Sequence, residues 1–135
     1  MSQENVEIVR RLYTAFNQLD TESFRNVWAD DAEWRPALIG GGLLEGEVYR
    51  GLDDVAEFLK VQEETWESVT ADPLAIRDLG ENVLAEVRLR AVGRGSGVPV
   101  ERITWTVFEI REDKIVAGRV YTVREEALEA VGLRE

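Results

Sequence analysis

The hydrophobic period of the chain changes near its middle, and this change limits the folds that the chain can adopt. In the first part, Val6, Val9, Tyr13 and Phe16 recur at helical spacing. In the second part, residues 83–92 alternate between apolar and charged side chains, as in a strand with one face buried. Helices followed by strands of this kind predict an α+β fold.

Three helices are predicted in the first half. The first lies near the N-terminus, the second is capped by Asp20, and the third begins at Gly51. The third helix has a buried face that includes Phe58 and Gln62, and we expect Trp66 to continue that face.

The first strand is expected between the second and third helices. It runs through Glu33, Trp34 and Arg35, and Pro36 ends it because proline cannot donate to a strand ladder. The following residues, 37–50, are rich in glycine and predict a flexible loop.

The strand at about residues 98–110 is apolar on both faces, which is typical of a strand covered on both sides. A three-residue turn with Asp113 in the left-handed region would pair Ile110 with Lys114 on the next strand. Counting back, this register places three pairs opposite one another: Trp105 and Arg119, Ile103 and Tyr121, and Thr106 and Gly118.

Composition excludes several classes of function. The 135 residues suffice for a single domain, residues 1–135, and the net charge of −11 makes a nucleic-acid partner unfavourable. The sequence has no apolar stretch long enough for a membrane span and begins with a polar segment, so we expect a cytoplasmic protein. With no histidine and no cysteine, thiolate and imidazole chemistry are absent. We expect no cofactor and no metal, and interpret Asp30 and Asp31 as a helix-to-strand junction.

The order helix, helix, strand, helix and meander, with Asp30 and Asp31 before the first strand, resembles the SnoaL-like group of the nuclear-transport-factor-2-like superfamily. The resemblance covers nearly the whole chain. It implies a cone, in which a curved, mixed but mostly antiparallel sheet packs on three N-terminal helices, with a short C-terminal helix. Such a cone encloses a pocket for a small molecule.

The resemblance also implies positions for catalytic groups, and these positions hold other residues here. Ketosteroid isomerases of the superfamily use a carboxylate base near the position of Arg35 and Pro36, a tyrosine at that of Leu12, and an acid at that of Trp105 or Thr106. Tyr13 is displaced from the tyrosine position by one residue, roughly 100° around the helix. The catalytic residues therefore remain unknown.

We predict that a small apolar or polycyclic molecule binds in the cone. The spacing and the family resemblance select six ligand residues: Tyr13, Trp34, Arg35, Tyr49, Trp66 and Thr106. Gly118 is expected to leave room for the ligand because it has no side chain.

A homodimer through the outer face of the sheet is predicted from the apolar outer residues of the two-sided strand. The predicted interface residues are Ile103, Trp105, Arg119 and Tyr121. Two alternatives to simple binding stay open: an enzyme of the polyketide-cyclase or isomerase kind with displaced acid and base groups, and a dimeric interaction domain with a filled cavity.

Overall fold

The computed structural model describes residues 2–36 and 48–133, and the part of the predicted loop at 37–47 lies outside them. The elements in chain order are α1 (Ser2–Gln18), α2 (Thr21–Asn26), β1 (Trp28–Arg35), β2 (Tyr49–Arg50), α3 (Leu52–Thr65), β3 (Trp66–Asp78), β4 (Asn82–Gly93), β5 (Pro99–Arg111), β6 (Lys114–Tyr121) and α4 (Arg124–Ala130).

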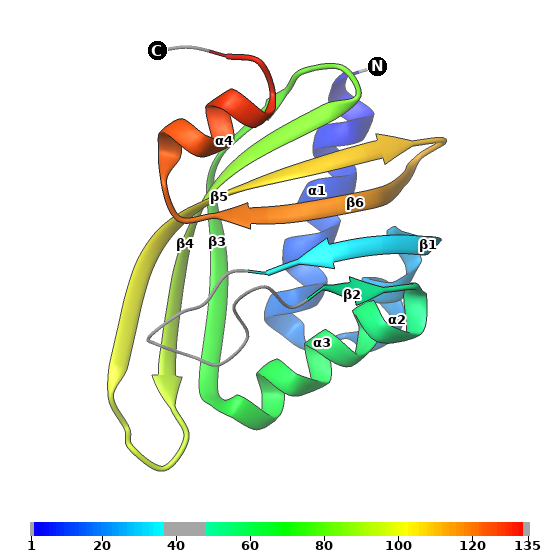
Figure 1. The fold of residues 1–135 in the computed structure, drawn as a ribbon. Helices are drawn as coiled ribbons and strands as arrows, with labels where there is room; N and C mark the ends of the chain where they lie inside the picture. The colour runs from blue at the N-terminus through cyan, green and yellow to red at the C-terminus, as the bar shows by residue number, and fades with distance from the viewer. Residues whose placement is uncertain (1, 37–47, 134–135) are drawn as a thin grey trace.

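One curved sheet of six strands organises the molecule, in the order β2-β1-β6-β5-β4-β3. Figure 1 shows the long strands bending around the side on which α1 lies, with α3 below and α4 above. The β1–β6 pair is parallel, and the other pairs are antiparallel. The predicted α+β fold is confirmed, including the mixed but mostly antiparallel sheet, the N-terminal helices and the short C-terminal helix.

The junction between α2 and β1 comes earlier than the sequence suggested. Asp20 caps α2 as predicted, because its carboxylate accepts a hydrogen bond from the backbone N–H of Ser23 at 3.2 Å. The strand begins at Trp28, so Asp30 and Asp31 lie within it rather than at a junction. Both are exposed, while Trp28 is buried in the core, and the β1–β6 register shifts between Trp28 and Glu33, so strict alternation of faces is interrupted there.

The third helix ends before Trp66. We expected Trp66 to lie on this helix, but the backbone is extended from Trp66 onward and β3 begins there. Arg94, in the turn between β4 and β5, donates hydrogen bonds to the backbone oxygens of Glu63 (2.8 Å) and Trp66 (3.0 Å). The side chain of Arg94 thereby ties the end of α3 to the β4–β5 hairpin.

Asn17 joins α1 to the edge strand β3. Its side chain accepts a hydrogen bond from the backbone N–H of Ala71 at 2.8 Å and donates one to the backbone oxygen of Ala71 at 3.0 Å. Two residues further along, Pro73 lies within the strand next to a shift in the β3–β4 register. Proline is tolerated there because an edge strand needs only one side of its backbone for pairing.

The register predicted between β5 and β6 is wrong by two residues. Glu112 and Asp113 both have positive φ, 51° and 66°, so the turn has two residues instead of the expected three. Arg111 pairs with Lys114, and an irregularity at Glu109 and Ile110 follows. The pairs along the rest of the ladder are Trp105 with Tyr121, Thr106 with Val120, Val107 with Arg119, and Phe108 with Gly118. A shift of two residues keeps each side chain on its predicted face, because side chains alternate with a period of two.

The C-terminal helix α4 covers part of the outer face of the sheet. Ala127 and Leu128 of α4 are buried against Leu84 of β4, with Trp105 and Tyr121 packed at the margin. Intramolecular packing thus accounts for part of the two-sided apolar pattern of β5.

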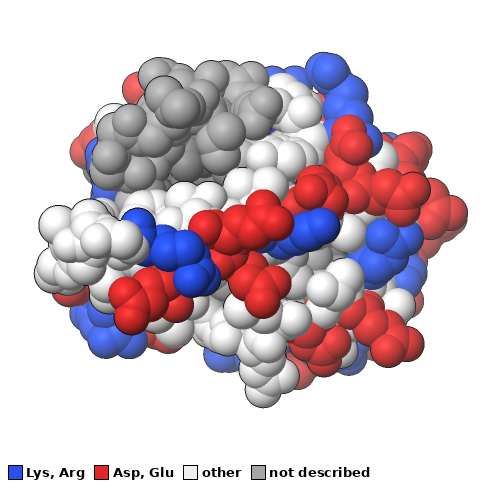
Figure 2. Space-filling model, turned by 90° about the horizontal axis from the view of Figure 1, so that it is seen from below, with Lys and Arg blue, Asp and Glu red and all other residues white. Residues whose placement is uncertain are grey.

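Charged side chains of both signs cover the surface. Figure 2 shows acidic side chains prevailing on the face seen from below, with basic ones scattered among them. This view offers no continuous basic area of the kind that tracks a phosphate backbone. Within residues 2–36 and 48–133, no helix combines the length and apolarity needed to cross a membrane.

Replacing Asn17 by alanine should lower the free energy of unfolding by roughly 1–3 kcal/mol, because the buried backbone of Ala71 loses both of its partners. Urea unfolding of the two proteins measures the difference. Gln18→Ala is the matched control, since Gln18 is an exposed neighbour on the same helix and its loss should change stability by less than about 0.5 kcal/mol. Equal losses in the two variants would show that the Asn17–Ala71 pair contributes little.

Candidate functional site

A cavity of about 380 Å³ lies between the helices and the concave face of the sheet. Its size falls within the range of small-molecule sites. Its described lining comes from α1, α2, α3 and every strand except β2: Leu12, Tyr13, Phe16, Phe24, Trp28, Trp34, Pro36, Phe58, Val61, Gln62, Thr65, Trp66, Val69, Ala71, Val87, Leu89, Thr104, Thr106 and Val120.

Trp34 forms the aromatic wall of the cavity. Its ring stacks on Phe108, with centroids 6.3 Å apart and an interplanar angle of 5°, and meets Trp28 and Phe58 edge-on. Offset and edge-to-face contacts of this kind hold a ring in one orientation. The wall is therefore a preformed surface for an apolar ligand.

Gly118 makes room for Trp34 and not, as predicted, for a ligand. A Cβ atom on Gly118 would lie 2.8 Å from Cε3 of Trp34 and 3.2 Å from Cδ1 of Phe108. Contacts this short would force the rings to shift. The glycine thus lets the indole of Trp34 approach the backbone of β6 closely. The indole occupies the space that a side chain at position 118 would need.

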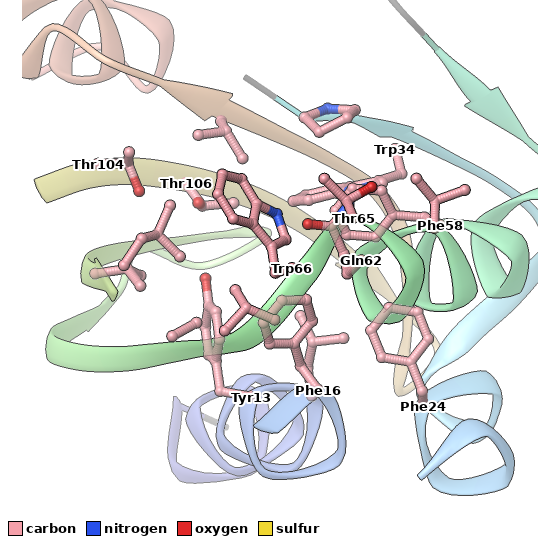
Figure 3. Close-up of a pocket in the computed structure, with 18 of the residues that line it drawn as sticks. Tyr13, Phe16, Phe24, Trp34, Phe58, Gln62, Thr65, Trp66, Thr104 and Thr106 are labelled. Atoms are coloured by element: carbon pink, nitrogen blue, oxygen red, sulfur yellow. The ribbon is translucent and has the colours of Figure 1, made fainter. Parts of the chain in front are cut away.

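Tyr13 supplies a buried hydroxyl group at the sheet side of the cavity. Figure 3 shows the Tyr13 hydroxyl directed from α1 toward Thr106 on β5, and a side-chain hydrogen bond links the two residues. Burial raises the pKa of Tyr13 well above its ordinary value, and the hydrogen bond to Thr106 opposes this rise only in part. Tyr13 is consequently neutral at pH 7 and serves as a hydrogen-bonding group, not as a base.

Two further polar side chains in the wall lack hydrogen-bond partners. Thr104 is 1% exposed and Gln62 is 8% exposed, and neither side chain has a hydrogen-bond partner within residues 2–36 and 48–133. Neither is among the fully buried unpaired atoms of these residues, so their polar groups reach the cavity. Our predicted ligand set missed both residues. Thr104 could have been found because it lies two residues from Thr106 on the same face of β5. Gln62 could have been found because it interrupts the apolar face of α3.

The indole N–H groups of Trp28 and Trp34 are also buried, and neither has a hydrogen-bond partner in the described part of the chain. A buried donor left unpaired costs roughly 1–3 kcal/mol. The aromatic wall therefore carries two donors that the described protein groups leave unsatisfied.

Four of the six predicted ligand residues line the cavity, namely Tyr13, Trp34, Trp66 and Thr106. Arg35 and Tyr49 are not part of the described lining. Arg35 follows Trp34 in β1 and is exposed beside Glu33, 3.7 Å away, because neighbouring residues of a strand point to opposite faces. The ring of Tyr49 packs edge-on against Phe58 at 5.4 Å, behind the wall.

The described lining contains no charged side chain, and no group of acidic residues in the described ranges could hold a metal ion. The positions that hold catalytic groups in ketosteroid isomerases carry no acidic residue here. Leu12 and Pro36 line the cavity with apolar atoms, and Thr106 contributes a hydroxyl group. These residues can shape and orient a ligand, but they supply no carboxylate for proton transfer.

The predicted interface residues gather on the outer face of the sheet. Trp105 and Tyr121 are paired across β5 and β6, and the guanidinium of Arg119 lies 4.9 Å from the centre of the Tyr121 ring. Trp105 and Tyr121 also contact the cluster under α4, whereas Ile103 lies beyond that cluster.

Known structures share this fold. An NTF2-like protein from Burkholderia xenovorans is 25% identical, with 98% of each chain covered and a TM-score of 0.77. TerC, co-crystallised with polyporic acid, is 18% identical over 95% of this chain and 98% of its own, with a TM-score of 0.77. A protein with a ketosteroid isomerase-like fold from Catenulispora acidiphila, in complex with trimethylamine, is 18% identical over 95% of this chain and 94% of its own, with a TM-score of 0.76.

No curated protein matches the chain. The family model of the SnoaL-like domain, in contrast, matches residues 9–118, which run from the first buried turns of α1 to the glycine beneath Trp34. This match includes most of the chain and every described lining residue of the cavity except Val120. The protein therefore belongs to the SnoaL-like domain family.

Proposed function

We propose that this protein binds a small, neutral, largely apolar molecule with an aromatic or polycyclic body inside the cavity. The observation that carries the proposal is a cavity of about 380 Å³ whose described lining is aromatic and aliphatic, with a few neutral polar groups. A cavity of about 150 Å³ holds benzene. The larger volume here suits a molecule of two or three fused rings.

The absence of charge in the described lining favours a neutral ligand. Burial of an unpaired charge in an apolar site costs several kcal/mol, and no described lining residue offers an opposite charge. The co-crystallisation of TerC with polyporic acid and the complex of the Catenulispora protein with trimethylamine support a small organic molecule as the class of ligand.

Binding without catalysis explains the site better than either alternative. A cyclase or isomerase needs an acid or base of suitable pKa near the ligand, and Tyr13 has its pKa raised away from neutrality. An interaction domain with a filled cone would have no space between Phe16, Trp66 and Thr104, which instead border the cavity.

Naphthalene should bind with one-to-one stoichiometry and a dissociation constant below about 1 mM, measured by isothermal titration calorimetry. Val69→Trp places a large side chain in the cavity and should weaken binding at least about tenfold. Thr70→Trp is the matched control, because Thr70 neighbours Val69 on β3 but is not part of this lining, and it should leave binding unchanged. Failure of neutral aromatics of one, two and three rings to bind would refute the proposed function.

The stability of the protein above pH 10 should depend on Tyr13. Tyrosine is neutral when protonated, and burial raises the pKa of Tyr13 in the folded state above its ordinary value of 10.0. The unfolded chain therefore releases this proton first, and the free energy of unfolding falls as pH rises above about 10, by up to roughly 1.4 kcal/mol per pH unit. Tyr13→Phe should remove this part of the slope in urea melts at pH 8, 10 and 11. An equal fall in the free energy of unfolding with pH in the wild type and in Tyr13→Phe would contradict this role of Tyr13.

We also infer a homodimer through the part of the outer sheet face that α4 leaves uncovered. Ile103 lies in this part, half-buried on the outer side of β5. Ile103→Glu should convert a dimer into monomers in sedimentation velocity, because a charge in an apolar interface is not compensated. Val98→Glu is the control, since Val98 is 56% exposed in the β4–β5 connection. A wild-type protein that is monomeric at micromolar concentration would refute the dimer.

A further inference from the structure

The cavity carries hydrogen-bonding groups on two different sides. On the sheet side lie the hydroxyl groups of Tyr13, Thr104 and Thr106. On the helix side lies the amide of Gln62, in the last turns of α3. Figure 3 shows Thr104 and Gln62 apart, with the ring of Trp66 between them in this view.

Thr104 and Gln62 are the informative members of this set because both are more than nine-tenths buried without a hydrogen-bond partner in the described residues. Tyr13 and Thr106, by contrast, already share a hydrogen bond. Neither Thr104 nor Gln62 is among the residues with fully buried unpaired atoms in the described ranges, so both polar groups reach the space of the cavity. A ligand that offers an acceptor or donor to each of the two groups would give each of them a hydrogen-bond partner.

We propose that the ligand is a neutral, planar aromatic molecule with a hydrogen-bonding oxygen at each of two ends, one paired with Thr104 and the other with Gln62. This inference rests on the proposed function and adds the chemical class of the ligand. The amide of Gln62 can donate and accept, and the hydroxyl group of Thr104 can do the same. Phenols, quinones and other ring-bound oxygens all satisfy this pattern, whereas carboxylates and sulfonates bring a charge that the described lining does not neutralise.

The aromatic side chains of the cavity wall set the shape of the molecule. Trp34 lines the cavity and packs against Phe108, which stacks almost parallel to it outside the described lining, and against Phe58, which meets it edge-on at 5.5 Å. A flat ring system can contact such a wall over a large area, and it brings little conformational entropy to be lost on binding. A flexible chain with the same oxygens would lose more rotational freedom.

Three probes of one ring system test the proposal: naphthalene, 2-naphthol and 2,6-dihydroxynaphthalene. Each added hydroxyl group should tighten binding to the wild-type protein by roughly 3- to 10-fold, as measured by calorimetry. Naphthalene-2-carboxylate at pH 7 should bind more weakly than 2-naphthol, because its charge has no partner.

Thr104→Val and Gln62→Met remove one polar group each with little change in volume. Each variant should lose the gain from one hydroxyl group of 2,6-dihydroxynaphthalene and should bind naphthalene at least as tightly as the wild type. Thr70→Val, which changes a threonine on β3 outside the described lining, is the control and should preserve all three affinities.

The outcomes separate the two proposals. Naphthalene binding without any gain from the hydroxyl groups would overturn the inference and leave the proposed function standing. Gains that persist in both variants would also overturn the inference, because the oxygens would then bind elsewhere. Failure of all three probes to bind would refute the proposed function together with the inference. A stepwise gain that each variant reduces by one step would support both.

Discussion

The parallel pairing of β1 with β6 is the contact on which the rest of the structure depends, because it joins the helical half of the chain to the meander. Lys114 donates a hydrogen bond to the backbone oxygen of Asn26 at 2.6 Å, and the backbone N–H of Ile115 donates one to Val27 at 2.9 Å. The pairing then places Trp34 over Gly118. Helices, sheet and aromatic wall therefore come into position together, and the cavity is a result of how the two halves meet.

The cavity combines two properties that usually oppose each other in a small domain. Its rings are packed against one another and hold their shape, yet Thr104 and Gln62 lie buried without partners among the described residues. Neither side chain contributes a hydrogen bond to the described fold, and the proposed ligand would give both of them a partner.

The sequence predicted which face of a helix or strand a side chain occupies more successfully than it predicted which residues pair across strands. Periods of 3.6 and 2 come from local backbone geometry, and they correctly placed Tyr13 and Thr106 toward the interior. The β5–β6 register depended on φ at Glu112 and on the irregularity at Glu109 and Ile110, which no pattern of side chains reveals, and so it was wrong by two residues. The role of Gly118 was misread for a similar reason, because the ring above it comes from a distant strand. The sequence shows Gln62 on the apolar face of α3, but it does not show that the amide lacks a hydrogen-bond partner, because that depends on residues far away in the chain.

The bond between Asn17 and Ala71 has a consequence for the behaviour of the protein in a crowded solution. An edge strand presents unpaired N–H and C=O groups to which a strand of another molecule can add, and this addition is a common start of aggregation. In β3, the outward N–H and C=O groups of Ala71 are occupied by the Asn17 side chain, and Pro73 has no N–H to offer. The first helix thus occupies the outward groups of β3 at Ala71, and together with Pro73 it protects the middle of this long edge strand against intermolecular pairing.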